Sequence, residues 1–293
     1  MNGILLVDKP ADWTSHDVVA KLRGVLGERR MGHSGTLDPM ATGLLVVFAG
    51  RATRAVSFSE NHSKCYEAHL RLGLTTDTQD TTGTVLSRCD RRVTRAELEA
   101  VLPQFRGDIL QVPPMYSALK VDGKKLYEIA RRGGEVARAA RPVTIGELTV
   151  LGEADGDYVL RVRCSKGTYV RTLCHDLGQM LGCGACMTSL RRTKANGFSL
   201  ADAVPLEEAE KLAKEGHIAS VCRSSEGCFE NLGRCTVPEN GLKFYLNGGS
   251  IGEKRLSDVT ERTELMRAYS ENGTFLGLCR LEEGEVKAVW KRI

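Results

Sequence analysis

The chain has 293 residues, of which 42% are hydrophobic, and a formal net charge of +4. This length favours one large domain with a small one, or two middling domains, and the hydrophobic content excludes an intrinsically disordered chain. No apolar run approaches the roughly 20 residues of a membrane span, and the N-terminus lacks a signal-peptide pattern. We therefore expect a cytoplasmic protein that makes no membrane contact.

Positive charge is concentrated in the first two thirds of the chain. Residues 1–200 hold 28 basic and 21 acidic groups, whereas residues 201–293 hold 13 and 16. Residues 120–141 contain seven basic groups against three acidic ones, and residues 161–194 contain seven against one. Such patches are typical of proteins that bind nucleic acid, although a solvated basic face has the same composition.

The N-terminal segment predicts a strand, a helix, a loop and a second strand. Residues 3–7 form a short apolar run, and Thr14 and Asp17 have the spacing of a capping box that opens a helix ending near Gly27. A second apolar run covers residues 44–49, and a short helix is expected to begin near Arg51.

The loop between these strands, residues 30–46, is rich in unusual residues. Gly32 and Gly35 permit positive φ or a close approach to a ligand, and Pro39 restricts Asp38 to an extended or turn conformation. A single carboxylate on a shaped loop that leads into a buried strand is a candidate catalytic group. An isolated loop of this kind could equally be a connector in which the Asp caps a turn.

The middle of the chain predicts strands and helices in irregular alternation. Residues 64–72 alternate, which places Tyr66 on the same face as three apolar residues, and a polar loop over residues 73–83 carries Asp77 and Asp80. Thr94 and Glu97 have capping-box spacing. Further along we expect a strand over 116–121, a tight turn at Asp122-Gly123 and a helix over 124–132.

The rest of the chain continues the mixture and then becomes strand-rich. Strands are predicted at 143–151, 158–164 and 187–194, and helices at 169–181 and 206–215. Beyond residue 226 short strands alternate with Gly-containing turns. We predict an α+β fold with a mixed, mainly antiparallel sheet and flanking helices, plus a small C-terminal β-barrel-like domain. The expected domains are residues 1–230 and 231–293.

Ten cysteines and six histidines raise the question of metal binding. Cys183 and Cys186 form one Cys-x-x-Cys pair, but no second pair at comparable spacing exists, and Cys222, Cys228 and Cys235 cluster only loosely. The histidines are scattered. We therefore expect reduced thiols in cores and loops, with no metal site.

The loop matches a known family. Gly32-His33-Ser34-Gly35-Thr36-Leu37-Asp38-Pro39, followed by Ala41-x-Gly43-Leu44-Leu45, closely resembles the catalytic motif of the TruB-type tRNA pseudouridine synthases. Ser34 stands where many relatives carry Thr, which keeps the hydroxyl. The resemblance extends from Gly3 to about Pro205. It implies a pseudouridine-55 synthase that flips a T-loop uridine of tRNA out of the stack and isomerises it without a cofactor.

The resemblance also assigns roles to single residues. It implies that Asp38 is the catalytic residue and that His33 helps to displace the target uridine. Tyr66 would pack against the base, and Arg171, in Lys166-Gly167-Thr168-Tyr169-Val170-Arg171, would pair with Asp38. A cation in this position would orient the carboxylate and compensate its charge. Read as isolated residues, Tyr66 could be core and Arg171 a surface phosphate contact.

Further parts of the pattern carry weaker assignments. Asp80 is similar to a loop carboxylate near the family's site, although a solvated turn Asp is the alternative. Tyr169 could line the pocket or be a core aromatic at the helix start. Asp8-Lys9-Pro10 resembles a family segment near the pocket, and Leu190, in Leu190-Arg191-Arg192, belongs to one near the RNA surface; neither segment is assigned a chemical step. We expect residues 120–141 to form a basic RNA-binding arm and the C-terminal domain to be a PUA-like RNA-binding unit of a monomer.

Two other functions stay open at this level. A non-catalytic RNA-binding module would need no carboxylate–Arg pair, and a nucleoside or glycoside hydrolase would need a second acid, which Asp77 or Asp80 could supply. Within the isomerase, Asp38 could attack C1′ or remove a sugar proton, and the sequence does not choose between these mechanisms.

Overall fold

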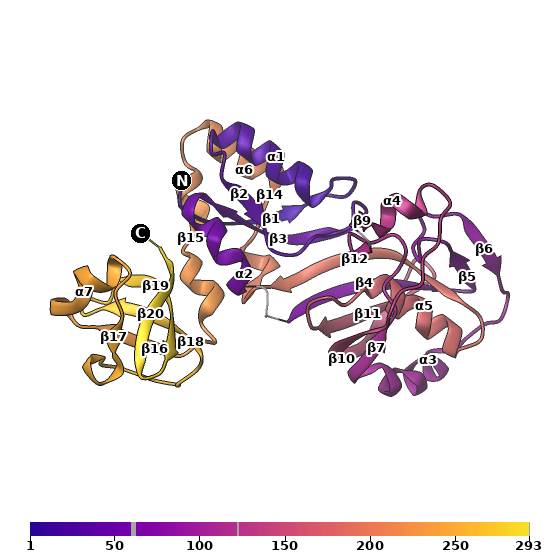
Figure 1. Ribbon diagram of the computed structural model, residues 1–293. Helices are drawn as coiled ribbons and strands as arrows, with labels where there is room; N and C mark the ends of the chain where they lie inside the picture. The colour runs from indigo at the N-terminus through magenta and orange to yellow at the C-terminus, as the bar shows by residue number, and fades with distance from the viewer. Residues whose placement is uncertain (60–62, 122, 293) are drawn as a thin grey trace.

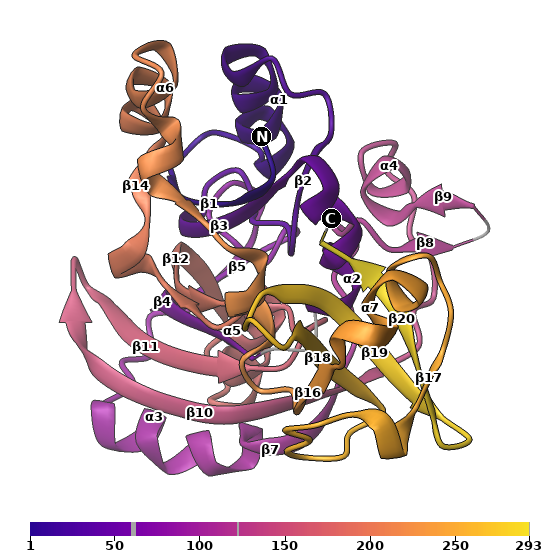
Figure 2. The ribbon, with the colours of Figure 1, turned by 90° about the vertical axis from the view of Figure 1, so that its left-hand side faces the viewer.

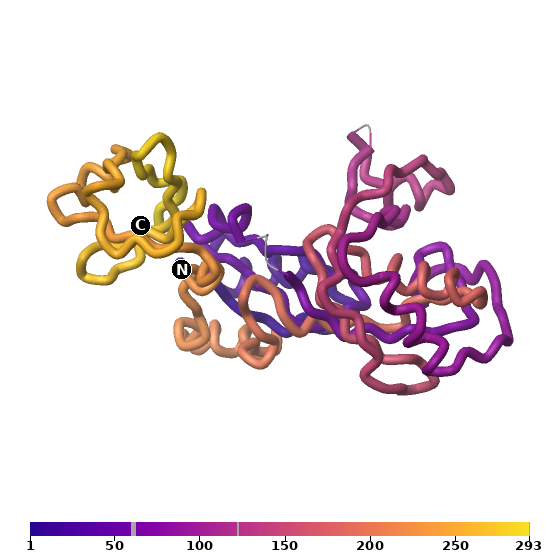
Figure 3. Tube along the Cα trace, turned by 90° about the horizontal axis from the view of Figure 1, so that it is seen from below, coloured from indigo at the N-terminus to yellow at the C-terminus, as the bar shows by residue number. Residues whose placement is uncertain are grey.

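A computed structural model of the chain describes residues 1–59, 63–121 and 123–292 (Figure 1). A large sheet with helices on its faces forms the body of an elongated molecule, and a smaller sheet built from the C-terminal residues lies at one end (Figures 1 and 3). No helix within the described residues is long and apolar enough to cross a membrane.

The large sheet is mixed and mainly antiparallel. Its strands run in the order β14-β1-β3-β12-β4-β11-β10-β7, and only the β1–β14 and β3–β12 pairs are parallel. The bounds are β1 (Gly3–Lys9), β3 (Thr42–Ala49), β4 (Lys64–Leu72), β7 (Gly107–Gln111), β10 (Arg141–Ala154), β11 (Asp157–Cys164), β12 (Ala185–Ala195) and β14 (Val204–Pro205). Three short strands pair beside this path, β2 (Met31–His33), β13 (Phe198–Ser199) and β15 (Cys222–Arg223).

Two pairs of helices cover the large sheet. The helices α1 (Ser15–Leu26) and α6 (Leu206–Lys214) pack over the β1 end, and α3 (Arg95–Val101) and α5 (Val170–Met180) contribute to the core under β4, β10 and β11. Both predicted capping boxes are present, at Thr14 and Thr94. Each such cap stabilises its helix by about 1 kcal/mol. The predicted helices at residues 14–27 and after Thr94 are therefore confirmed.

Short helical segments connect these elements. The predicted helix near Arg51 is a 3-10 turn, η1, followed by the short helix α2. The segments are η1 (Gly50–Ala55), α2 (Val56–Ser59), η2 (Leu102–Phe105), η3 (Leu200–Asp202), η4 (Ile218–Val221), η5 (Ser225–Phe229) and η6 (Glu253–Arg255).

Residues 73–88 are more ordered than the sequence suggests. The segment predicted as a polar loop contains β5 (Leu74–Thr76), which pairs with β6 (Val85–Arg88), and all three residues of β5 are buried. The prediction was wrong for β5, because Thr75 and Thr76 can be buried there: their hydroxyls form hydrogen bonds with the Ser87 hydroxyl and the Asp80 carbonyl.

The predicted strand over 116–121 was wrong except for its last two residues, which form β8 (Lys120–Val121). The reason is that the carbonyls of Tyr116, Ser117 and Leu119 bind Arg171, Tyr127 and Leu126 and not a neighbouring strand. The predicted helix over 124–132 is shorter, because its first residues pair as β9 (Lys124–Lys125) before α4 (Leu126–Ala130). Of the predicted turn, Asp122 lies outside the described residues. This segment projects from the body (Figure 3).

The C-terminal residues form a curled five-stranded sheet, as predicted (Figure 2). Its order is β16-β18-β19-β20-β17, with β16 (Arg234–Val237), β17 (Ile251–Gly252), β18 (Leu265–Ser270), β19 (Phe275–Glu282) and β20 (Glu285–Lys291). The helix α7 (Glu239–Leu246), which the sequence pattern did not indicate, packs against β16 and β20.

The two sheets share one hydrophobic cluster. Ile4 and Phe48 of the large sheet are fully buried in the same cluster as Phe229, Phe275 and Trp290. The Trp290 ring lies 5.9 Å from that of Phe229 and 6.0 Å from that of Phe275, in tilted aromatic contacts. A common core of this kind holds the C-terminal sheet firmly against β1 and β3.

Candidate active site

Asp38 lies in the loop between β2 and β3, and the loop is fixed from both sides. The buried Ser15 hydroxyl, on the first turn of α1, accepts a hydrogen bond from the Leu37 amide at 2.8 Å. The Ala41 amide donates to the Asp38 carbonyl at 3.0 Å and closes a turn around Pro39. The carboxylate is therefore presented by a constrained backbone.

Lys9 holds the same turn in place through hydrogen bonds, a role that the sequence pattern did not reveal. Its buried ammonium group donates to the carbonyls of Pro10, Trp13 and Pro39, at 2.8, 2.5 and 3.1 Å. Burial lowers the pKa of Lys9 to about 8, which leaves it charged at neutral pH. Its three donors are all used by carbonyls, so Lys9 acts as a structural tie beside Asp38.

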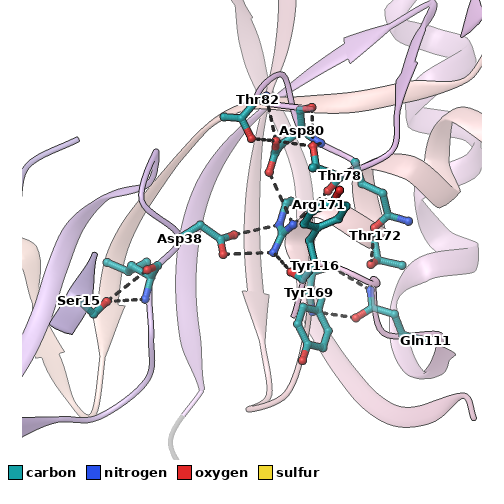
Figure 4. Close-up of polar contacts among 12 residues, drawn as sticks. Ser15, Asp38, Thr78, Asp80, Thr82, Gln111, Tyr116, Tyr169, Arg171 and Thr172 are labelled. Carbon is teal, nitrogen blue, oxygen red and sulfur yellow. Dashed lines mark hydrogen bonds and ion pairs between the residues drawn. The ribbon is translucent and has the colours of Figure 1, made fainter. Parts of the chain in front are cut away.

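Arg171 meets the Asp38 carboxylate with two nitrogens (Figure 4). Its Nε lies 2.9 Å from Oδ2 and its Nη2 donates to Oδ1 at 3.1 Å. Such two-point contacts fix direction as well as distance. The Arg171 side chain is only 7% exposed, whereas that of Asp38 is 34% exposed. The cation is thus held inside the protein and the carboxylate remains open to a substrate.

The remaining donors of Arg171 are also engaged. Nη1 donates to the Thr78 carbonyl at 3.0 Å and lies 3.6 Å from Asp80, and Nη2 donates to the Tyr116 carbonyl at 2.9 Å. Asp80 is itself fixed, because the hydroxyls of Thr78 and Thr82 donate to its Oδ1 at 2.7 and 2.6 Å. The alternative of a solvated turn Asp is wrong for Asp80, whose side chain is 6% exposed.

The start of α5 is anchored by a side-chain amide. Gln111, on β7, accepts a hydrogen bond from the Tyr169 amide at 2.7 Å and donates to the Tyr169 carbonyl at 3.0 Å. One residue beyond Arg171, the Thr172 hydroxyl donates to Gln79 at 2.8 Å. These contacts fix the rotation of the helix that carries Arg171 (Figure 4).

Tyr66 and Leu190 lie in the hydrophobic layer beneath the loop. They are 8% and 7% exposed and belong to the same cluster as Leu37 and Ala41, on either side of Asp38. Burial raises the pKa of Tyr66, so its phenol stays neutral. The Arg192 charge acts against this increase, and the Asp38 charge adds to it. Tyr66 therefore lies near Asp38, and Leu190 is a buried core residue with little surface left free.

A cavity of about 540 Å³ opens beside the loop. Its walls include Ser34 and Gly35 from the loop, Tyr169 from the start of α5, and the cations Lys64, Arg141 and Lys166. Both its volume and its charge suit a nucleotide. Tyr169 is half-buried and lines this cavity.

His33 lies on β2, five residues before Asp38, with its Nδ1 buried and without a hydrogen-bond partner in the described part of the chain. Burial lowers the pKa of His33 to about 4, with the Arg192 charge adding to the effect. The imidazole is therefore neutral at physiological pH. A neutral ring suits the filling of space in an RNA stack better than the binding of a phosphate.

This shift predicts a pH-dependent stability. The folded state disfavours the His33 cation. The free energy of unfolding is therefore highest above the unfolded pKa of about 6.5, and it decreases as the pH falls towards 4. When the pH is lowered from 7.5 to 5, the free energy of unfolding of the parent should decrease by about 1–2 kcal/mol more than that of His33→Gln. Urea titrations of both proteins at the two pH values measure this difference. Equal losses would contradict the buried, neutral imidazole.

The second carboxylates considered for hydrolysis are poorly placed for that chemistry. Asp80 faces two threonine hydroxyls and Arg171, so it is not free to protonate a leaving group. Asp77 accepts a hydrogen bond from the Thr84 amide at 2.7 Å and one from the Tyr116 hydroxyl at 3.4 Å. Asp38 is therefore paired with a cation, Arg171, and not with a second carboxyl group.

All ten cysteines lie within the described residues, where they are thiols and none forms a disulfide. Cys183 and Cys186 are buried, and the Cys183 thiol faces the Gly184 carbonyl. Across the described ranges no group of three or more His, Cys, Asp or Glu side chains is arranged to hold a metal ion.

Solved structures share the fold. The chain is similar to a component of an H/ACA RNP bound to a substrate RNA containing 2′-deoxyuridine, with a TM-score of 0.77 and 22% identity over 99% of this chain and 85% of that one. It is also similar to a chain of a Cbf5-Nop10-Gar1 complex, with a TM-score of 0.76 and 25% identity over 95% and 78% of the two chains.

Sequence comparison identifies the class and then the family. The N-terminal domain model of the TruB family pseudouridylate synthases matches residues 23–170, and the tRNA pseudouridylate synthase B C-terminal domain model matches residues 171–231. The chain is therefore a pseudouridine synthase, an isomerase. It is 42% identical to the tRNA pseudouridine synthase B of Stutzerimonas stutzeri over 97% of this chain and 92% of the relative. The corresponding protein of Clostridium novyi is 42% identical over 95% of both chains. The chain belongs to the TruB family.

Proposed function

We propose that this protein is a tRNA pseudouridine-55 synthase that isomerises a T-loop uridine of tRNA. The observation that carries the proposal is the Asp38–Arg171 pair, in which a buried guanidinium aims a partly exposed carboxylate. A basic, nucleotide-sized cavity is lined by Ser34 and Gly35 of the same loop, although neither Asp38 nor Arg171 lines it. The names of the relatives, which act on tRNA, support the choice of substrate.

The reaction needs no net electron transfer. The N1–C1′ bond of uridine breaks, the base turns, and C5 joins C1′; C5 loses its proton and N1 gains one. Asp38 serves either by attacking C1′ or by removing a sugar proton, and in both cases it must be ionised and aimed. Arg171 supports this with its two-point contact, and Asp80 supports Arg171 in turn.

The remaining residues would receive the flipped nucleotide. Tyr66 offers an aromatic face near Asp38, and base–aromatic stacking contributes about 1–3 kcal/mol. His33 would fill the space that the uridine leaves, which offsets part of the few kcal/mol required for flipping. Tyr169 lines the cavity, and Leu190 supports the floor beneath the base.

Other parts of the chain would hold the rest of the RNA. The projecting segment 120–141 is a candidate basic arm that closes on the T-arm, and residues 231–293 would form the PUA-like unit that follows a catalytic domain of residues 1–230. The protein would act as a cytoplasmic monomer without a membrane partner, metal or cofactor.

The deciding experiment is incubation with unmodified tRNA transcript, followed by quantification of pseudouridine and released uracil. We expect pseudouridine at position 55 only, no uracil, and the same rate in excess chelator. A transcript with cytidine at that position is the matched control. Uracil release would identify a hydrolase, and RNA binding without either product would identify a binding module.

A further inference from the structure

A second cavity, of about 480 Å³, lies where the two sheets meet, away from the loop that carries Asp38. One wall is formed by Arg30 before β2, by Arg51 and Arg54 of η1, and by Phe58 of α2. The other wall is the end of β20, with Trp290 and Lys291. Its volume is within the range of small-ligand sites.

The lining is strongly basic. Four cations contribute to it, and no carboxylate does within the part of the chain that the structure describes. Two of the cations are already engaged, because Lys291 donates to the Leu246 carbonyl at 2.7 Å and Arg30 lies 4.0 Å from Glu28. The guanidinium groups of Arg51 and Arg54 have no hydrogen bond or ion pair among the described residues.

Both walls of the cavity are anchored in the same hydrophobic cluster. Ala52 and Ala55 of η1 are 4% and 0% exposed and share a hydrophobic cluster with Trp290, which is 4% exposed. Phe58 and Val289 pack against the same cluster. The arginines are therefore carried on a backbone already in position, and a ligand would not have to order it first.

Like charges held together in this way repel, and an anion between them would relieve the repulsion. Guanidinium groups match the geometry of a phosphate with two donors each. We propose that the interdomain cavity binds a phosphodiester group of the RNA substrate through Arg51 and Arg54. The identity of that RNA as tRNA rests on the proposed function.

The position of the cavity relates it to the candidate active site. Strands β2 and β3 pair so that His33 lies opposite Val47, and the Gly50 amide donates to the Arg30 carbonyl at 2.7 Å. At about 3.3 Å per residue, Arg51 is at most roughly 13 Å along the chain from the residue opposite His33. A phosphate at Arg51 therefore belongs to the RNA whose uridine His33 would replace.

The test is the double variant Arg51→Ala/Arg54→Ala, assayed with full-length tRNA. We expect Kd and KM for tRNA to rise about tenfold, with kcat changed less than twofold, and the slope of log K against log salt to decrease in magnitude by about 1. Unchanged binding of tRNA, or an unchanged salt slope, would overturn the proposal.

Two controls separate this site from general charge and from folding. Lys211→Ala/Lys214→Ala on α6 removes the same charge from an exposed helix and should leave tRNA affinity within twofold of the parent. The melting temperature of Arg51→Ala/Arg54→Ala without RNA should equal or exceed that of the parent, whereas a structural role predicts a decrease.

A final measurement distinguishes RNA from a free anion. Inorganic phosphate is titrated into the parent and into the double variant. If the variant no longer binds phosphate but keeps the tRNA affinity of the parent, the cavity is a small-anion site and the proposal is overturned. A failure of the proposed function would be recognised separately, because the parent protein would then form no pseudouridine. The salt-dependent binding measurement does not depend on that result.

Discussion

Asp38→Asn is expected to abolish pseudouridine formation while the protein still folds and binds tRNA. The amide keeps the volume and the turn geometry of the loop but supplies neither a nucleophile nor a base. We expect kcat to fall by at least about 10⁴-fold, as for the loss of other essential catalytic groups. Single-turnover assays with saturating enzyme measure this loss separately from binding.

The fold should survive this change because Arg171 keeps its other partners. Asp80 and the carbonyls of Thr78 and Tyr116 remain in place, and Asp38 is itself 34% exposed. Asp77→Asn, which changes an exposed carboxylate on the neighbouring turn, is the matched control and should retain most of the kcat. Pseudouridine formed by Asp38→Asn, with deamidation excluded by mass spectrometry, would refute the mechanism.

Local signals predicted much of the fold, because the interactions behind them are close in sequence. The capping boxes at Thr14 and Thr94 and the alternation of β4 each involve residues a few positions apart. The segment around Tyr116 was predicted wrongly, because its carbonyl binds Arg171, 55 residues later. A contact of that separation leaves no periodicity in the local sequence.

In the candidate site, too, contacts between residues far apart in the sequence could not be predicted from local patterns. The pairing of Asp38 with Arg171, 133 residues apart, was expected only through the resemblance to a family, and the structure places the two in contact. The burial of Asp80 depends on Thr78, Thr82 and Arg171 together. The resemblance placed Asp8-Lys9-Pro10 near the pocket, but the contacts of Lys9 with three carbonyls were not predicted, since lysine is rarely buried.

Arg171→Ala should lower kcat about 10³-fold and also destabilise the protein. The catalytic loss follows from the two contacts that aim Asp38, since a misplaced reacting group loses its orientation. The stability loss has a different origin. Asp80, 6% exposed, would be left as a buried charge without its cation, and breaking such a pair costs about 3 kcal/mol.

The two effects can be separated with Arg171→Ala/Asp80→Asn. Neutralising Asp80 removes the unpaired charge, so urea denaturation should show most of the lost stability restored, while kcat stays low because Asp38 still lacks its guide. Adding Asp38→Asn to Arg171→Ala should lower kcat little further, because the two groups act as one unit. If the Asp80 change restored kcat together with stability, Arg171 would be only a structural residue.

Arg171→Lys replaces the two-point guanidinium contact with a single ammonium group and should retain only part of the kcat.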